Sequence, residues 1–339
     1  LFDGDELYLG GVMEHIEEAG IHSGDSSCTL PPITLGPDII AKVKDATEKI
    51  ARGTGVRGLI NIQFAYVSEN LYVIEANPRA SRTVPFVSKA TGVQMAKAAV
   101  LIGLGKSIAE LKAEGYLPSN MDGASLPEET AIAVKAAVLP FARFRTPEGV
   151  VVDSLLSPEM RSTGEVMGLD QHFDTAFAKA QAGAGSPMPT SGKVFISVAN
   201  HDKRNVIIYA KMLESLGFEI VSTGGTAEIL RRNGLNSVIV ASKFAEANGD
   251  HSIVDMVRNG DIDLILNTPA GGAARSDGYE IRAAAVSVGC PVMTTISEFA
   301  AAVQAINALR EHSWDIMSLQ EHGVQLAAAV DARSEGGEA

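Results

Sequence analysis

Stretches with the apolar period of a helix and stretches with that of a strand both occur along the chain, but the order in which they follow one another changes near residue 192. This change divides the chain in two. In the first part, β-branched and aromatic runs over 56–67 and 71–76 predict a β-hairpin, and helical apolar spacing flanks it. This mixture predicts an α+β arrangement with an antiparallel hairpin sheet. The elements expected around it are a strand over about 6–14, a helix from Gly36–Pro37 to about Arg52, a helix pair beginning near Pro85 and continuing over 92–104, a connection over 113–130, a strand over 131–140 and a short helix over 174–184.

Beyond residue 192, short apolar strands alternate with helical stretches. This alternation is typical of an α/β domain with a doubly wound parallel sheet and helices on both faces. Ligands of such sheets bind at the carboxyl ends of the strands. The strands are expected over 193–199, 218–223, 237–241, 262–268 and 291–295.

Small residues and prolines over 183–192 sustain neither period, so this stretch predicts a linker. The polar end of the chain has no apolar period either and predicts a disordered tail. The expected division is therefore a first domain over 1–120, a connecting segment of that domain over 121–185, a linker over 186–192, a second domain over 193–330 and a tail over 331–339.

Composition restricts the partners and the compartment. The 339 residues carry 28 Lys and Arg against 41 Asp and Glu, a formal charge of −13, which argues against nucleic acid as a partner. Phosphate ligands would then be held by local groups of cations. Only two cysteines, Cys28 and Cys290, occur in a chain of this size, which indicates a reducing cytoplasm. They lack the spacing of a metal site and are expected to be buried as small apolar residues. The sequence contains no signal peptide and no apolar run of membrane-spanning length, so no membrane partner is expected.

The hairpin carries the clearest candidate chemistry. Glu75 and Asn77 are two residues apart and so share one face of a strand. If residues 68–70 form a three-residue loop with Asn70 in the left-handed conformation, the expected pairs are Val67 with Leu71, Ala65 with Val73, Gln63 with Glu75 and Asn61 with Asn77. Such carboxylate and amide oxygens suit a hard cation such as Mg²⁺. The alternative is a solvated sheet face, but asparagine is a poor strand former, so we favour the metal site.

Two arginines follow this hairpin. Arg79 and Arg82 lie three residues apart at the entrance to the next predicted helix. Taken singly, each arginine is an ordinary surface residue. Beside a Mg²⁺ site, however, they suit phosphoryl transfer, because charge on the transferred group must be neutralised in place.

These motifs carry a family resemblance. Gln63 together with IEANPRASRTVPFVSKATG (74–92) resembles the metal-binding end of the ATP-grasp fold, and the longer string is similar to the second, carbamoyl phosphate-forming half of the carbamoyl-phosphate synthase large-subunit family. The stretches GGVMEHIEEAGIHSGDSS (10–27) and SPEMRSTGEVMG (157–168) resemble the same family in the same order. Other ATP-grasp ligases share the Glu-x-Asn-Pro-Arg core without these flanks. The resemblance covers nearly the whole chain and implies a C-terminal fragment of an ATP-dependent ligase.

The resemblance implies roles for individual residues of the first domain. Two Mg²⁺ or Mn²⁺ ions would be held by Gln63, Glu75 and Asn77, and ATP is the substrate. Arg79 and Arg82 would steady carbamate or the phosphoryl oxygens. ATP would be bound by Gly20, Ile21, His22, Ser23, Gln63 and Glu75. From the residues alone, the loop at 20–23 is equally an ordinary polar loop whose histidine caps a helix.

The resemblance also implies partners. A monovalent cation, K⁺, would bind near His15 and Glu17–Glu18, although from the residues alone this run of charges is equally a solvated face. The intact enzyme would pair with a glutaminase small subunit, form an oligomer and serve arginine and pyrimidine biosynthesis. In the family, the phosphate-gripping lid and the adenine-binding strands precede residue 1. The fragment alone is therefore expected to bind ATP weakly and to be inactive.

The second domain resembles the methylglyoxal-synthase-like (MGS-like) regulatory domain of the same family. Its STGGTAEIL stretch (222–230) places hydroxyls and amides where a phosphate binds, or forms an ordinary turn with a threonine cap. The resemblance implies a nucleotide effector such as UMP or IMP, although Gly271–Gly272 departs from the family pattern. The expected effector-binding residues are Ser197, Lys203, Thr223, Thr226, Lys243, Asn267 and Thr268.

Two other functions remain open for this domain. His201–Asp202 and Asp250 fall near the places where methylglyoxal synthase carries catalytic groups, so a lyase of that type is one alternative. However, the acidic and histidine-containing segment expected after the fourth strand is absent from the sequence. The remaining alternative is a nucleotide-binding interaction module without chemistry.

Overall fold

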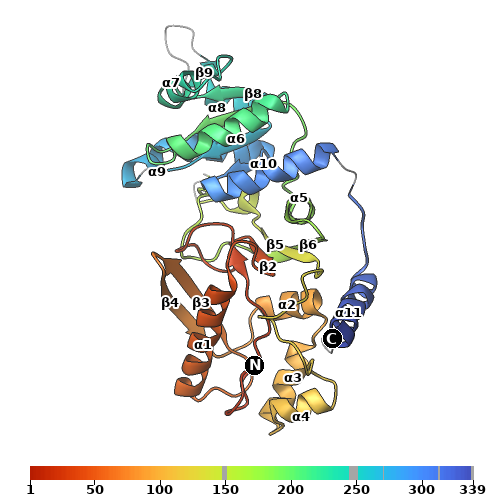
Figure 1. Cartoon of the computed structure of the whole chain (residues 1–339). Coiled ribbons are helices and arrows are strands. Elements are labelled where there is room, and N and C mark those ends of the chain that lie inside the picture. Colours follow the sequence, from red (N-terminus) through yellow and green to blue (C-terminus); the bar gives the residue numbers. More distant parts are fainter. Residues whose placement is uncertain (147–150, 244–250, 270, 312–313, 337–339) are drawn as a thin grey trace.

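The structure, a computed structural model, describes residues 1–146, 151–243, 251–269, 271–311 and 314–336. Figure 1 shows the elements of the first half of the chain on one side and the parallel sheet with its helices on the other. The last helix returns to lie beside the elements of the first half. This arrangement agrees with the two predicted fold classes.

The first half contains a β-hairpin that is preceded and followed by helices, and Tyr72, Val73 and Ile74 of this hairpin are exposed to solvent. The hairpin consists of β3 (Asn61–Val67) and β4 (Asn70–Asn77). The preceding helix, α1 (Pro37–Thr54), begins with a proline, whose fixed φ suits a first helical turn, and is followed by Gly55 with a left-handed φ of 64°. These boundaries confirm the helix predicted from Gly36–Pro37. The helices that follow the hairpin are α2 (Thr83–Thr91), α3 (Met95–Gly103) and α4 (Ile108–Ala113).

A four-stranded antiparallel sheet lies between the hairpin region and the second half. Its order is β1-β2-β5-β6. The strand predicted over 131–140 and the helix predicted over 174–184 are confirmed as β5 and α5, but the strand predicted over 6–14 is reduced to β1. Residues 8–13 run outside any strand. The elements are β1 (Glu14–His15), β2 (Cys28–Leu30), β5 (Ile132–Val138), the short 3₁₀ helix η1 (Phe141–Arg143), β6 (Gly164–Asp170) and α5 (Phe173–Gly183).

The second half contains a six-stranded parallel sheet in the order β10-β9-β8-β7-β11-β12. The chain runs outward from β7 in one direction and then returns to β11 on its other side, which is a doubly wound topology. All five predicted strands are present. The strands are β7 (Lys193–Ser197), β8 (Glu219–Ser222), β9 (Ile239–Ser242), β10 (His251–Ser252), β11 (Leu264–Asn267) and β12 (Val292–Met293).

Alternate residues of this sheet face two separate cores. Val194 and Ile196 of β7 pack with α6 (Lys203–Ser215), α7 (Gly224–Arg232) and α10 (Ile296–Glu311). Phe195 packs on the opposite face with α8 (Ile253–Arg258) and α9 (Gly271–Val288). The period of two along the strand thus sets which helices cover which face.

Helix α5 joins the two halves. Phe177 and Ala180 are fully buried in the same core as Phe299 and Ala302 of α10, and Figure 1 shows α5 between the antiparallel sheet and α10. The predicted linker packs as well, because Met188 is buried in this core. A continuous core therefore crosses the boundary predicted at 186–192.

The terminal helix α11 (Leu319–Gly336) docks on the first half of the chain. His322 is buried, and its Nε2 lies 3.1 Å from the carbonyl oxygen of Ala90 in α2. The prediction of a disordered tail is wrong for residues 331–336, which continue this helix, while 337–339 lie outside the described residues. No helix in the described ranges is long and apolar enough to cross a membrane.

Candidate functional site

The hairpin brings its polar residues together as the sequence predicts, although by a different route. Asn61 pairs with Asn77, and Gln63 pairs with Glu75. The loop has two residues rather than three: Ser68 and Glu69 both have positive φ values, of 48° and 68°. The predicted pairs of Val67 with Leu71 and Ala65 with Val73 are therefore wrong, since Val67 pairs with Asn70 and Ala65 with Tyr72.

A register shift next to Gln63 reconciles these two results. Phe64 pairs with Val73, whereas Gln63 pairs with Glu75, so β4 holds one extra residue, Ile74, at this point. Such a bulge moves the register by one residue, which offsets the shorter loop. The polar pairs thus lie opposite each other beyond the bulge.

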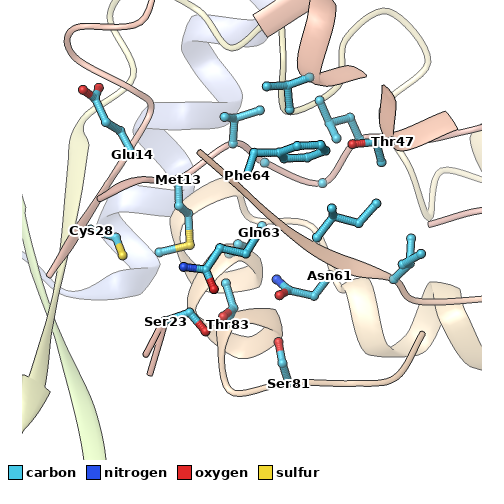
Figure 2. A pocket seen from close by; sticks show the side chains of 18 of the residues that line it. Met13, Glu14, Ser23, Cys28, Thr47, Asn61, Gln63, Phe64, Ser81 and Thr83 are labelled. Atoms are coloured by element: carbon cyan, nitrogen blue, oxygen red, sulfur yellow. The ribbon is translucent and has the colours of Figure 1, made fainter. Parts of the chain in front are cut away.

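One side of the hairpin faces a cavity of about 400 Å³. Figure 2 shows the amides of Asn61 and Gln63 pointing into it, towards the hydroxyls of Ser23, Ser81 and Thr83. Arg79 also lines this cavity. Glu75 and Asn77 are not among the described lining residues, so the cavity holds part of the predicted metal set and adjoins the rest.

The three predicted metal ligands carry only one negative charge between them. Within the part of the chain that the structure describes, no three His, Cys, Asp or Glu side chains gather as a metal site. Gln63, Glu75 and Asn77 contribute one carboxylate and two amides, an all-oxygen donor set that suits Mg²⁺ or Mn²⁺. With a single protein carboxylate, most of the balancing negative charge would come from a phosphate ligand.

Ser81 adds a donor that the sequence did not single out. Its Oγ is buried and has no hydrogen-bond partner among the described residues, although it belongs to the cavity wall. Buried hydroxyls are normally paired, so an unpaired one at a cavity indicates a place for a ligand atom. Its place in the sequence between Arg79 and Arg82 is the feature from which a role for Ser81 could have been predicted.

The predicted ATP loop is fixed on several sides. Gly20 has a φ of 106°, which suits glycine, and Ile21 and His22 follow it. The Nδ1 of His22 accepts a hydrogen bond from the Gly24 amide at 2.9 Å, and the His22 amide donates to the carbonyl of Ser157 at 3.0 Å. His22 therefore organises its own loop rather than capping a helix.

A buried lysine supports the same loop. Lys135, in β5, is 2% exposed, and its Nζ donates to the Ser23 carbonyl at 2.7 Å. Burial, together with the charge of Lys135, lowers the pKa of His15 to about 4. Lys135 is the one charged residue of the apolar strand IAVKAAV, and this could have indicated from the sequence that it has a special role.

Arg82 is held in place, whereas Arg79 reaches the cavity. The Nη2 of Arg82 donates to Ser162 Oγ at 2.6 Å and lies 3.3 Å from the Gly24 carbonyl oxygen. The Asp25 carboxylate accepts hydrogen bonds from the Arg161 and Ser162 amides at 2.7 and 2.9 Å. Residues 157–162 and the ATP loop thus form one hydrogen-bonded unit around Arg82.

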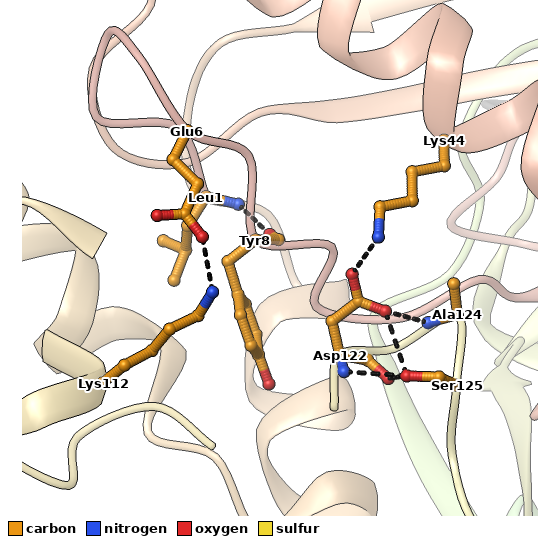
Figure 3. A network of polar contacts seen from close by, with 8 residues as sticks. All are labelled: Leu1, Glu6, Tyr8, Lys44, Lys112, Asp122, Ala124 and Ser125. Atoms are coloured by element: carbon orange, nitrogen blue, oxygen red, sulfur yellow. Dashed lines mark hydrogen bonds and ion pairs between the residues drawn. The ribbon is translucent and has the colours of Figure 1, made fainter. Parts of the chain in front are cut away.

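A second network fixes the wall on the α1 side of the cavity. Figure 3 shows the Asp122 carboxylate joined to Lys44 of α1 at 2.6 Å and to the Ala124 amide at 2.9 Å. Gly123 packs on the backbone of Gly10 and Gly11, where an added Cβ would lie 2.3 Å from the Gly11 nitrogen. Residues 122–124 of the predicted connection over 113–130 therefore pack against the cavity wall and are held there by hydrogen bonds.

Two buried carboxyls from opposite halves of the chain interact with each other, and one of them, Glu17, lines the cavity. Burial, together with the charge of Glu298 in α10, raises the pKa of Glu17 to about 8. Burial also raises the pKa of Glu298 to about 7. Glu17 accepts a hydrogen bond from the Ser27 amide at 2.7 Å.

The predicted effector residues gather at the carboxyl edge of the parallel sheet. Ser197 Oγ lies 3.2 Å from Thr223 Oγ1, and the Thr268 amide donates to the Ser197 carbonyl at 3.2 Å. A Cβ on Gly225 would lie 3.4 Å from the ammonium of Lys203, which places that charge over the first turn of α7. These contacts surround the point where the strand order reverses, which is where doubly wound sheets bind ligands.

The other predicted residues of this edge have varied surroundings. The Asn267 amide nitrogen lies 3.5 Å from the Ser197 carbonyl oxygen, and Thr226 Oγ1 lies 3.5 Å from the Val198 nitrogen. Lys243 forms an ion pair with Glu280 of α9 at 2.8 Å. Asp250 of the lyase alternative lies outside the described residues.

Comparisons with known proteins agree with both halves. The family described as "Carbamoyl-phosphate synthase L chain, ATP binding domain" matches residues 6–111, and the "MGS-like domain" family matches residues 205–294. The fold and these matches define a protein with an ATP-binding domain followed by an MGS-like domain.

Similar curated proteins identify the family. The chain is 70% identical to the carbamoyl phosphate synthase large chain of Kocuria rhizophila over 324 residues, which are 95% of this chain and 29% of that protein. It is 66% identical to that of Micrococcus luteus, covering 97% of this chain and 30% of the relative, and 59% identical to that of Streptomyces coelicolor, covering 98% and 30%. The chain belongs to the carbamoyl phosphate synthase large-chain family and spans about three tenths of the length of these relatives.

Proposed function

We propose that this chain supplies the metal-binding end of a site that phosphorylates carbamate with ATP, giving carbamoyl phosphate and ADP in the intact enzyme. The observation that carries the proposal is the hairpin, in which Asn61 lies opposite Asn77 and Gln63 opposite Glu75 beside a cavity of about 400 Å³. Amide oxygens of Asn61 and Gln63 and the Arg79 guanidinium line this cavity, together with the Ser81 hydroxyl, which has no partner among the described residues. Oxygen ligands for a metal ion and a cation for the phosphoryl oxygens are what phosphoryl transfer requires.

In this proposal, Gln63, Glu75 and Asn77 hold two Mg²⁺ or Mn²⁺ ions, which supply charge neutralisation on the ATP phosphates. The loop of Gly20, Ile21, His22 and Ser23 contacts ATP. Arg79 steadies carbamate or the phosphoryl oxygens from the cavity wall. Arg82, fixed by Ser162 and Gly24, keeps its positive charge at one place, so little reorganisation is needed during the reaction.

The parallel sheet is proposed to bind a nucleotide effector such as UMP or IMP. The support is the meeting of Ser197, Lys203 and Thr223 at the strand ends, with the first-turn amides of α7 available to a phosphate. Thr226, Asn267 and Thr268 line the same edge. Lys243 would take part by exchanging its ion pair with Glu280 for the ligand.

Several properties of the whole protein are proposed from the family alone. The intact enzyme would receive ammonia from a glutamine-hydrolysing small subunit, form an oligomer, work in the cytoplasm and serve arginine and pyrimidine biosynthesis. A K⁺ ion near Glu17 would offset the repulsion between the buried carboxyls. The chain alone is proposed to be inactive. ATP hydrolysis by the isolated chain with bicarbonate would contradict this last point.

The proposed chemistry is tested by Glu75→Gln in the full-length large chain. We expect ATP synthesis from carbamoyl phosphate and ADP to fall about 100-fold, because the charged metal ligand is lost. Glu69→Gln removes the same charge from the turn of the same hairpin and should retain activity. Equal activity of the two variants would contradict the proposed metal site.

A further inference from the structure

Arg282 joins two segments that are far apart in the sequence. It lies in α9, and its side chain is 0% exposed. Its Nε and Nη2 donate to the two oxygens of Asp153 at 2.7 and 2.6 Å, and its Nη1 donates to Asn267 Oδ1 at 2.8 Å. A guanidinium presents its donors in one rigid plane, so the positions of Asp153 and Asn267 are fixed relative to each other.

One end of this bridge lies in the proposed effector site. Because Arg282 occupies the Oδ1 of Asn267, the amide nitrogen is turned to the end of β7, 3.5 Å from the Ser197 carbonyl oxygen. The hydrogen bond between Arg282 and Asn267 requires glycine at position 278, because a Cβ added there would lie 2.3 Å from Arg282 Nη1 and 2.4 Å from Asn267 Oδ1.

The other end leads to the proposed ATP site along residues 151–162. Asp153 belongs to this segment, and the hydroxyl of Tyr279 donates a second bond to it, to the Val151 carbonyl at 2.6 Å. Further along, the Ser157 carbonyl accepts the amide of His22 at 3.0 Å, and Ser162 Oγ accepts from Arg82 at 2.6 Å. Residues 151–162 therefore contact α9 at one end, where Arg282 connects them to Asn267, and the ATP loop at the other.

We infer that Arg282 is a positioning residue that couples the proposed effector site to the ATP loop through Asp153 and residues 151–162. The inference rests on the proposed effector function. A phosphate ligand that draws the Asn267 amide towards Ser197 and Thr223 changes the contact between Asn267 and Arg282. The rigid guanidinium then moves Asp153 with it, and the segment carries the shift to His22 and Arg82.

The coupling is measured in the full-length large chain by calorimetry. The dissociation constant of a nonhydrolysable Mg–ATP analogue is determined with and without saturating UMP, and again with IMP. The ratio of the two constants is the coupling factor, and a typical allosteric factor is about 5- to 150-fold. With Asp153→Asn, which breaks the charged fork, we expect a ratio near one while the effector still binds within about threefold of its original affinity.

Two further variants sharpen the test. Tyr279→Phe removes only one hydroxyl and is expected to fold and to reduce the coupling factor in part. Asp170→Asn is the matched control, because Asp170 is also half-buried and ion-paired, with Lys179 at 2.7 Å, but lies off the route; its coupling factor should be unchanged.

The outcomes separate the inference from the function on which it rests. A coupling factor that stays at its original value in folded Asp153→Asn and Tyr279→Phe would overturn the role of Arg282 while leaving effector binding intact. Failure of the unsubstituted protein to bind either UMP or IMP would contradict the proposed effector function, and the inference would fall with it.

Discussion

At the scale of single residues, the structure distinguishes side chains that hold the site together from those that await a ligand. Ser162 Oγ accepts from Arg82 and donates to the Gly24 carbonyl at 2.9 Å. Ser81 Oγ, by contrast, is buried at the cavity without a partner among the described residues. The two serines should therefore respond in opposite ways to the loss of their hydroxyls.

Ser81→Ala should change the free energy of unfolding by less than about 0.5 kcal/mol, because its hydroxyl has no hydrogen bond to any residue that the structure describes. It should weaken Mg–ATP binding to the full-length large chain by about fivefold to tenfold. Denaturant unfolding and calorimetry measure the two quantities. Ser162→Ala is the control and should cost about 1–3 kcal/mol of stability. Unchanged ATP affinity in Ser81→Ala would show that this hydroxyl does not meet the ligand.

At the scale of elements, close packing between β6 and α5 anchors the antiparallel sheet to the rest of the molecule. A Cβ added to Gly168 would lie 2.0 Å from the Ala176 carbonyl oxygen and 2.5 Å from the Ala180 nitrogen. At Gly183, at the end of α5, the three atoms nearest to an added Cβ are side-chain atoms of Val166, at 3.5 Å or beyond. The same substitution therefore has different costs at the two positions.

Gly168→Ala should lower the free energy of unfolding by about 3 kcal/mol or more, because backbone atoms must separate to admit the methyl group. Gly183→Ala should be neutral or stabilising by up to about 1 kcal/mol, as expected for alanine in place of a helical glycine. Denaturant unfolding followed by circular dichroism measures both. Similar stabilities for the two variants would contradict the packing of β6 on α5.

Element boundaries also show what the sequence does and does not predict. Apolar period and Pro–Gly punctuation are local, so α1, β5, α5 and the parallel strands were predictable. The hairpin was predicted with the right polar pairs but the wrong turn, because a three-residue loop and a two-residue loop with a bulge at Ile74 give the same pairing at Gln63. Local sequence does not distinguish these two solutions.

Contacts between distant segments were beyond reach for a different reason. The roles of Lys135 and of the Arg282–Asp153 pair depend on which elements become neighbours, and the local pattern of apolar and polar residues does not specify that. A terminal helix over 321–332 could be expected to pack on a neighbour, but the contact of His322 with α2 could not be specified for the same reason. The family resemblance supplied the candidate site, whereas the tertiary contacts show how it is supported.

At the scale of the whole molecule, the two halves meet through a shared core and through a pair of buried carboxyl groups. The Glu17 carboxyl comes from the first half and that of Glu298 from α10 of the second. In the unfolded chain both ionise near pH 4.5, whereas burial keeps them protonated in the folded chain to about pH 8 and 7. Folded protein then binds more protons than unfolded protein, so stability falls as pH rises through this window.

Glu17→Gln should remove much of this dependence. Compared with the unsubstituted chain, the variant should be more stable at pH 8 by about 1–3 kcal/mol, with a difference that shrinks towards pH 5. Denaturant unfolding across this pH range, in buffers free of K⁺, measures the effect. Glu18→Gln, at an exposed neighbour, should leave the slope unchanged. A variant with the original slope would contradict the burial of an ionisable Glu17.

The central claim is that the hairpin presents its oxygen atoms to divalent ions that hold ATP. Anomalous diffraction from crystals of the full-length large chain grown with Mn²⁺ and a nonhydrolysable ATP analogue tests it most directly. We predict a manganese peak within coordination distance of Gln63 and Glu75, with Asn77 beside it. Bound nucleotide with its manganese away from these side chains would contradict the account.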